Sequence, residues 1–133
     1  MELVRIGTVA SPLKERAAAP KQADEGAPEA WLEFDADVAE GLEGIAVGDE
    51  LVVLTWLDRA RRDVLRVHPR RDPARPETGV FNSRSPDRPN PIGLHRVTVL
   101  EVDGLRLRVS ALEALDGTPI VDVKPRLGGV DER

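Results

Sequence analysis

The fold is constrained most by a succession of short β-rich segments that proline and glycine turns separate. Residues 3–10, for example, read Leu-Val-Arg-Ile-Gly-Thr-Val-Ala and are followed at once by Ser11-Pro12. Segments in which apolar residues recur at the spacing of an amphipathic helix are almost absent. Many short strands with turn signals between them are typical of β-barrels. The sequence therefore predicts an all-β protein, a small single-domain β-barrel with long loops and at most short helical turns.

The run 50–57 is the most apolar of these segments, so we expect it to be a central strand. Residues 64–68 are expected to return beside it as the second strand of a hairpin. Asp103-Gly104 is a strong short-range hairpin signal between the two strands that flank it. The strands expected after 3–10 are thus 31–35, 50–57, 64–68, 94–102, 105–112 and 119–123.

The segments between these strands are expected to be loops and turns. Residues 13–29 and 69–78 are polar and aperiodic, which is typical of long loops. Residues 37–42 are expected to form a single helical turn with Asp37 as its candidate cap, and residues 114–118 a tight turn. The barrel domain is expected to cover residues 1–125, and residues 126–133 to form a frayed tail.

Composition excludes several classes of site. The chain has no cysteine, so disulfides, thiolate metal sites and cysteine nucleophiles are excluded. Two histidines make a histidine-based zinc site improbable, and no metal is expected. No apolar run is long enough to span a bilayer, and the N-terminus has no signal-peptide pattern, so no membrane partner and a cytoplasmic location are expected.

Positive charge is concentrated in the middle of an acidic chain. Residues 59–96 hold ten arginines against four acidic residues, whereas the whole chain has a net charge of −5. A basic segment of this kind indicates an anionic partner. The alternative is that the arginines pair with nearby acids on a solvated face. Aromatic residues make up 3% of the chain, which argues against a base-stacking surface for RNA.

Residues 79–94 are unusually restricted for a loop. They open on a short apolar strand signal at Val80-Phe81 and close on another at residues 92–94, and three prolines lie between. Proline fixes its own φ and biases the preceding residue toward extended geometry. A loop stiffened in this way loses little entropy when a ligand binds, which suits a polar binding site. A rigid structural crossover with solvated arginines is the alternative.

Three motifs carry a resemblance to a known family. Residues 79–94 read Gly-Val-Phe-Asn-Ser-Arg-Ser-Pro-Asp-Arg-Pro-Asn-Pro-Ile-Gly-Leu. This block resembles the signature G-V-F-x-[ST]-R-S-P-x-R-P-N-P-I-G-[LM] of the TsaA-like (TrmO) family. Residues 116–125 resemble the family's second element, a D-G-T-P followed by an aliphatic run. Pro20-Lys21-Gln22 resembles the family's P-R-Q, with a lysine that lacks the planar fork of arginine.

The resemblance implies a small β-barrel, usually a homodimer, that binds S-adenosyl-L-methionine without a Rossmann fold. The sequence agrees on the last point, because no Gly-x-Gly-x-x-Gly follows a strand. Backbone groups of Leu94 and of the turn at residues 116–119 are expected to read the adenine edge. The expected cofactor-binding residues are Pro20, Lys21, Gln22, Asp58, Arg84, Leu94, Asp116, Gly117, Thr118 and Pro119.

The TrmO branch methylates N6 of threonylcarbamoyladenosine beside the anticodon of transfer RNA. Methyl transfer from a sulfonium mainly requires nucleophile, methyl carbon and sulfur to be held in line. Arg84, whose fork can grip a carboxylate, and Asp58 are the residues expected to act in catalysis. Asp58 stands where the enteric branch has a histidine, so its role there is a departure, and a solvent-exposed strand end is the alternative. Arg88 and Asn90 are expected to brace the loop.

The sequence leaves two other functions open. One is a module that binds S-adenosyl-L-methionine as a sensor without methyltransferase activity. The other is a methyltransferase for a small molecule, which is favoured if the arginines of residues 59–75 are paired internally. The enteric branch also continues into a C-terminal domain that helps to hold transfer RNA. Without it, we expect the barrel, the dimer or another protein to supply any RNA surface.

Overall fold

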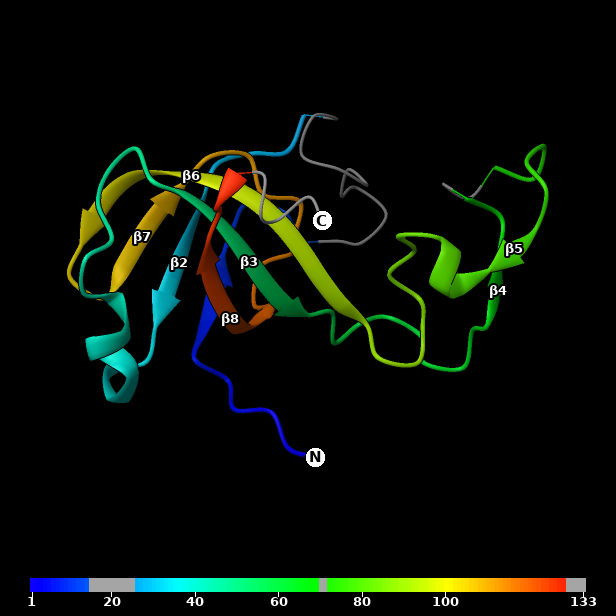
Figure 1. Ribbon diagram of the computed structural model, residues 1–133, viewed down its shortest axis with the longest axis horizontal. Helices are drawn as coiled ribbons and strands as arrows, with labels where there is room; N and C mark the ends of the chain where they lie inside the picture. Colours follow the sequence, from blue (N-terminus) through cyan, green and yellow to red (C-terminus); the bar gives the residue numbers. More distant parts are fainter. Residues whose placement is uncertain (15–25, 70–71, 129–133) are drawn as a thin grey trace.

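The structure is a computed structural model that describes residues 1–14, 26–69 and 72–128. Within these residues, antiparallel strands close into a barrel in the order β1-β2-β7-β6-β3-β8 (Figure 1). The strand β8 closes the barrel by pairing with both β1 and β3. The barrel strands are β1 Gly7–Ala10, β2 Ala30–Phe34, β3 Glu50–Trp56, β6 Ile92–Asp103, β7 Arg106–Val109 and β8 Pro119–Pro125. The expected all-β barrel is confirmed.

The barrel interior is filled by alternate residues of each strand, as strand geometry requires. In β3 the inward residues are Leu51, Val53 and Thr55, and all three are buried. Full burial of a Val or Leu side chain stabilises a fold by about 1.5–3 kcal/mol. The buried apolar cluster consists of Val9, Ala30, Leu32, Phe34, Leu51, Val53, Val97, Val99, Leu107, Val109, Leu112, Ala114 and Ile120.

The hairpin expected at Asp103-Gly104 is confirmed. Asp103 pairs with Arg106, and β6 and β7 run antiparallel on either side of the turn. Gly104 has a φ of 60°, a left-handed conformation that glycine adopts without a steric cost. The strand expected at 119–123 is also present, and it continues as β8 to Pro125.

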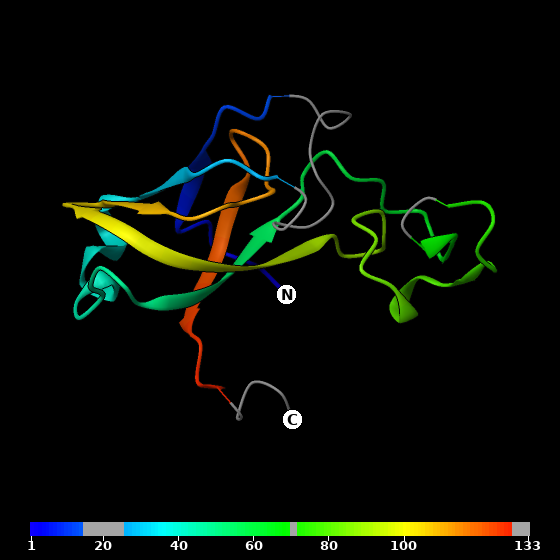
Figure 2. The same cartoon turned by 90° about the horizontal axis from the view of Figure 1, so that it is seen from above.

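Residues 57–91 leave the barrel between β3 and β6, and we call them the arm. The arm contains a separate two-stranded sheet of β4 Arg66–Val67 and β5 Thr78–Gly79. Figures 1 and 2 show the arm extending sideways from the barrel. The expected hairpin of 64–68 with β3 is therefore wrong. Both edges of β3 are occupied by β6 and β8 over most of its length, so no edge is left for a third partner.

Two local expectations are corrected by the backbone. Val80-Phe81 belongs to a 3-10 helix, η5 Val80–Asn82, with Val80 buried and Phe81 80% exposed. The helical turn expected at 37–42 is a 3-10 helix, η3 Ala36–Leu42, whose N-cap is Asp35. Asp37 lies in its first turn, so its expected role as the cap is wrong. Over the described residues, no helix has the length and apolar character to cross a membrane.

Candidate functional site

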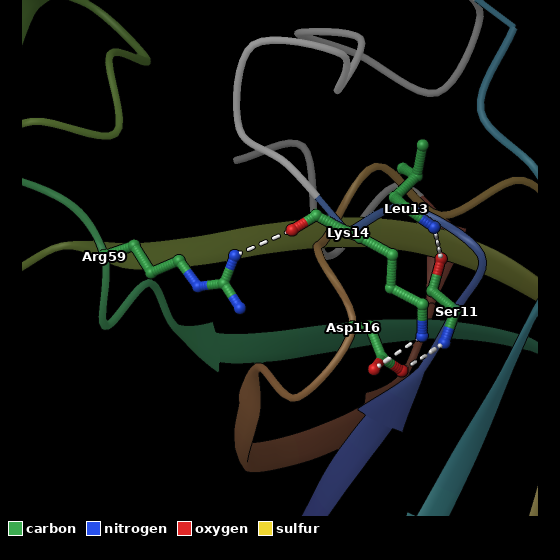
Figure 3. A network of polar contacts seen from close by, with 5 residues as sticks. All are labelled: Ser11, Leu13, Lys14, Arg59 and Asp116. Carbon is green, nitrogen blue, oxygen red and sulfur yellow. Dashed lines mark hydrogen bonds and ion pairs between the residues drawn. The ribbon is translucent and has the colours of Figure 1, made fainter.

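The Asp116 carboxylate connects two segments that lie far apart in the sequence. Its Oδ1 accepts a hydrogen bond from the backbone N–H of Ser11 at 2.9 Å, and its Oδ2 accepts one from Lys14 Nζ at 2.8 Å (Figure 3). The bond from Lys14, followed by that from Ser11, lowers the pKa of Asp116 below its usual value. The carboxylate is therefore ionised at neutral pH and fixes the segment after β1 against the turn before β8.

The backbone of the 116–118 turn is also bonded to the first strand and its extension. Asp116 donates its N–H to Leu13 O at 2.7 Å, and Gly117 donates its N–H to Val9 O at 2.8 Å. Thr118 accepts a bond from Val9 N at 2.9 Å. Gly117 has a φ of 84°, which favours glycine. Because the turn's N–H groups are used inside the chain, it can offer a ligand mainly the carbonyl oxygens of Asp116 and Gly117.

Leu94 lies where one edge of β6 has no neighbouring strand. Val99 donates its N–H to Asp49 O, and Pro91 O accepts from Leu57 N. The backbone groups of Val99 and Pro91 therefore point toward the β3 side of β6. Backbone groups alternate along a strand, so those of Leu94 point to the opposite edge. On that edge β7 is paired only from Val99 onward. The N–H and C=O of Leu94 thus form a donor and acceptor pair that no described strand covers.

An open cleft of about 440 Å³ lies beside the Asp116 carboxylate. Arg106 Cζ lies 4.0 Å from the ring centroid of Trp31, one of the lining residues, and so covers part of the indole. Arg108 is held by Glu29 at 2.7 Å and by Glu101 at 3.2 Å. Besides Asp116, the lining consists of Ala10, Ser11, Pro12, Lys14, Glu29, Ala30, Trp31 and Arg108.

The base of the arm contacts this site through Arg59, whose Nη1 donates to Lys14 O at 2.9 Å (Figure 3). Asp58, its neighbour in the sequence, is exposed at the end of β3 and donates its N–H to Trp56 O. Within the described residues the Asp58 carboxylate has no hydrogen-bond partner. The structure thus puts Asp58 next to the site's border, at the solvent-exposed strand end that the sequence left as the alternative.

Arg84 lies on the arm, after η5, and its side chain is exposed. It makes no hydrogen bond or ion pair with any described residue, and no described contact joins it to Asp116. The structure therefore does not bring Arg84 together with the 116–119 turn in one chain. The expected contacts of Pro20, Lys21 and Gln22 fall outside the described residues.

The arm is braced by arginines, as expected for Arg88 and Asn90. Arg88 Nη2 donates to Val80 O at 2.6 Å and to Ser83 O at 3.0 Å. Arg62 donates to Pro89 O at 2.7 Å and to Asn90 Oδ1 at 3.0 Å. Hydrogen bonds from a charged donor are among the stronger ones in proteins. These bonds hold the proline-rich block in one shape.

Other arginines of the arm form ion pairs at the surface. Arg61 pairs with Asp63 at 3.1 Å, Arg66 with Glu77 at 2.6 Å, and Arg75 with Asp72 at 3.9 Å. Each described arginine of residues 59–75 thus has a partner within the chain, which is an acid for Arg61, Arg66 and Arg75 and an uncharged oxygen for Arg62. The pairing that would favour a small-molecule acceptor is therefore present in part. In β6, the exposed Arg96 resembles Arg84 in having no described partner.

Sequence reasoning missed the residues that hold Asp116 in place. The sequence indicates Ser11 only as the end of a strand and Lys14 only as part of a loop. Their separations from Asp116 are 105 and 102 residues. No local pattern signals a contact of that range.

Comparison with known proteins shows the family to which the chain belongs. The chain matches the family of the tRNA-methyltransferase O N-terminal domain, TrmO_N, over residues 8–132. An S-adenosyl-L-methionine-binding protein of Archaeoglobus fulgidus is 44% identical over 124 residues, covering 93% of this chain and 88% of that protein. A probable S-adenosyl-L-methionine-binding protein of the same organism is 44% identical over 131 residues, covering 98% of this chain and 35% of its own length.

Solved structures give the same result. The crystal structure of TrmO from Pseudomonas aeruginosa matches all of this chain with a TM-score of 0.78 and 28% identity. The chain covers 58% of that protein and thus spans little more than half its length. The chain belongs to the TrmO_N family, and the expected resemblance is confirmed.

Proposed function

We propose that this chain is a methyltransferase that uses S-adenosyl-L-methionine to methylate transfer RNA, at N6 of threonylcarbamoyladenosine beside the anticodon. The observation that carries the proposal is the uncovered N–H and C=O pair of Leu94 in β6. Adenine offers an acceptor nitrogen beside an exocyclic amine donor, and a backbone donor and acceptor pair matches that edge. The named relatives are described as binding S-adenosyl-L-methionine, which contains an adenine.

The residues present fit this cofactor. The backbone groups of Leu94 and the carbonyl oxygens of Asp116 and Gly117 would hold its base, and the cleft beside Asp116 is of nucleoside size. Pro20, Lys21, Gln22, Thr118 and Pro119 are assigned to the same site by the family motifs. When bound, the cofactor supplies a methyl group activated by a sulfonium. The chain contributes rigid positioning, because the bonds from Arg62 and Arg88 fix the loop that ends in β6.

The acceptor is assigned to Arg84 because its guanidinium is not engaged by described residues. A planar fork binds a carboxylate or phosphate through two parallel hydrogen bonds, and threonylcarbamoyladenosine carries both groups nearby. Asp58, exposed beside Arg59, is the candidate for accepting the proton released from the methylated nitrogen. A transfer RNA substrate also implies a cytoplasmic location.

A homodimer would bring the separated parts together. The arm presents Phe81, 80% exposed, and Leu65, 63% exposed, and both are large apolar residues away from the barrel core. Exposed apolar groups on a protruding segment favour burial against another surface. We assign that surface to a second copy, whose cleft would then receive Arg84. Light scattering of the purified protein tests the dimer, and a monomer at micromolar concentration would contradict it.

A small-molecule acceptor is the second candidate, favoured by the ion pairs of Arg61, Arg66 and Arg75. Calorimetric titration with S-adenosyl-L-methionine, followed by a methyl-transfer assay on bulk transfer RNA, separates the candidates. Binding with transfer to RNA is the expected result. Binding without transfer would favour the small molecule or a sensor. No binding by folded protein free of carried-over cofactor would contradict the proposal itself.

A further inference from the structure

Three polar side chains form a chain of hydrogen bonds next to the candidate site. Thr55 Oγ1 lies 2.8 Å from His95 Nε2, and His95 Nδ1 lies 2.6 Å from Glu113 Oε1. Thr55 is fully buried and His95 is 4% exposed, so both lie among the buried, mainly apolar residues of the barrel. The three side chains come from three different parts of the fold, namely Thr55 from β3, His95 from β6 and Glu113 from the segment between β7 and β8.

Their hydrogen-bond roles follow from the chemistry of the end groups. An ionised Glu113 carboxylate only accepts, so Nδ1 of His95 carries a proton and donates it. In neutral His95, Nε2 then accepts from the hydroxyl of Thr55. All three side chains therefore have a hydrogen-bond partner, as buried polar groups require.

Gly93 is the residue that makes room for this chain. It stands opposite Thr55 in the β3–β6 register. A Cβ at Gly93 would lie 2.7 Å from His95 Nε2 and in closer contact still with Thr55 Oγ1. Packing therefore explains why position 93 of the proline-rich block is a glycine, because a larger side chain there would collide with Thr55 Oγ1 and His95 Nε2.

The chain of bonds joins the parts from which the candidate site is built. His95 follows Leu94 directly, and Glu113 precedes Asp116 by three residues. The segment 110–115 is bonded to β6 at its start, where Ser110 N donates to Thr98 O. Closer to Asp116, the Glu113–His95 contact is the described side-chain link from this segment to β6.

We propose that His95 is a positioning residue that sets the 116–118 turn against the free edge of β6 at Leu94, through its bond to Glu113 and with Thr55 fixing its ring. The expected effect on cofactor affinity rests on the proposed function. The effect on the turn itself does not. Glu113→Gln keeps an oxygen that accepts from Nδ1, whereas Glu113→Ala removes it, so this pair separates the hydrogen bond from the charge.

The test has two readouts and a matched control. Ser110→Ala removes the bond from Thr98 N to Ser110 Oγ, 2.8 Å long, on the same segment but farther from Asp116. Hydrogen exchange at the amides of Asp116 and Gly117 is measured without ligand. We expect exchange there to rise about tenfold in Glu113→Ala, and to stay near wild type in Glu113→Gln and Ser110→Ala. Calorimetry should give a loss of affinity for S-adenosyl-L-methionine of about tenfold in the same variant only.

The outcomes are distinguishable. Unchanged exchange at the turn in Glu113→Ala, or an equal rise in Ser110→Ala, would overturn the positioning role. Wild-type protein that shows no affinity for the cofactor contradicts the proposed function, while the exchange result still decides this inference. If Glu113→Ala does not fold, Thr55→Val, which keeps the side-chain volume and frees the ring of His95, is expected to raise exchange at the same amides.

Discussion

Replacing Gly93 with alanine tests the packing around the buried polar chain most directly. The added methyl would lie 2.7 Å from His95 Nε2 and would press on Thr55 Oγ1. Both neighbours are buried on stiff strands and cannot swing away. The Thr55–His95 bond would be lost or stretched, at about 0.5–1.5 kcal/mol. Forcing a methyl into a filled core costs about a further 1–3 kcal/mol.

The expected total is a loss of about 2–4 kcal/mol in the free energy of unfolding. For a chain of this size that lowers the Tm by about 10 °C, measured by circular dichroism at fixed pH. Gly41→Ala is the matched control, because a Cβ at Gly41 meets nothing within 4 Å and its φ is not left-handed. This control should leave the Tm unchanged or raise it by a few degrees.

The double variant Gly93→Ala with Thr55→Ala adds a check on the cause. Removing the hydroxyl and methyl of Thr55 frees space for the new Cβ, so the two changes should be non-additive. A Gly93→Ala protein whose Tm equals that of the Gly41→Ala control would refute the reasoning. Strict additivity in the double variant would refute the assigned collision with Thr55.

Three further predictions concern charge. The pKa of Asp116 is lowered in the folded chain, chiefly by its bond from Lys14, so its contribution to stability is present at neutral pH and is lost as pH falls through the native pKa. Asp116→Asn should therefore flatten the decrease in Tm that a Tm–pH profile shows below about pH 4. An unchanged decrease would contradict the assignment. Arg84→Ala should reduce methyl transfer at least tenfold with the Tm unchanged. Arg75→Ala, which removes an arginine already paired with Asp72, should leave the Tm unchanged and lower methyl transfer much less. A large fall in Tm for Arg84→Ala would make it a structural brace. Affinity for transfer RNA should fall steeply with salt in a filter-binding assay. On single-stranded RNA, the logarithm of the association constant should fall against the logarithm of the salt concentration with a slope of about −0.7 per phosphate contact. An affinity that does not change with salt would count against an RNA substrate.

The sequence predicted the elements whose signals are local. The apolar run of residues 50–57 and the Asp103-Gly104 turn signal each lie within a few residues, and β3 and the β6–β7 turn are found there. The partner of 64–68 was mispredicted because strand pairing over the arm depends on which edges of β3 are already filled. Local propensity contains no information on that competition.

The candidate site was predicted in part for the same reason. Motifs picked out Asp116 and Leu94, but the partners Ser11 and Lys14 meet Asp116 across more than a hundred residues. The buried polar chain did have a local signal. Val97 and Val99 are inward residues of β6, so by the period of a strand Gly93 and His95 face inward as well. A histidine at a core position next to a glycine at another indicates a buried polar group, His95, for which Gly93 leaves space.

The paired arginines of the arm do not by themselves decide between RNA and a small molecule. Surface ion pairs are worth about 0–1 kcal/mol each, because water screens both partners. Exchanging a carboxylate for a phosphate therefore costs little, and the described arm still holds seven arginines against five acidic residues. A small molecule can use only the few cations that it touches. An RNA backbone can recruit paired and unpaired arginines alike, so the pairing in the free chain lowers the affinity of each contact without removing the surface.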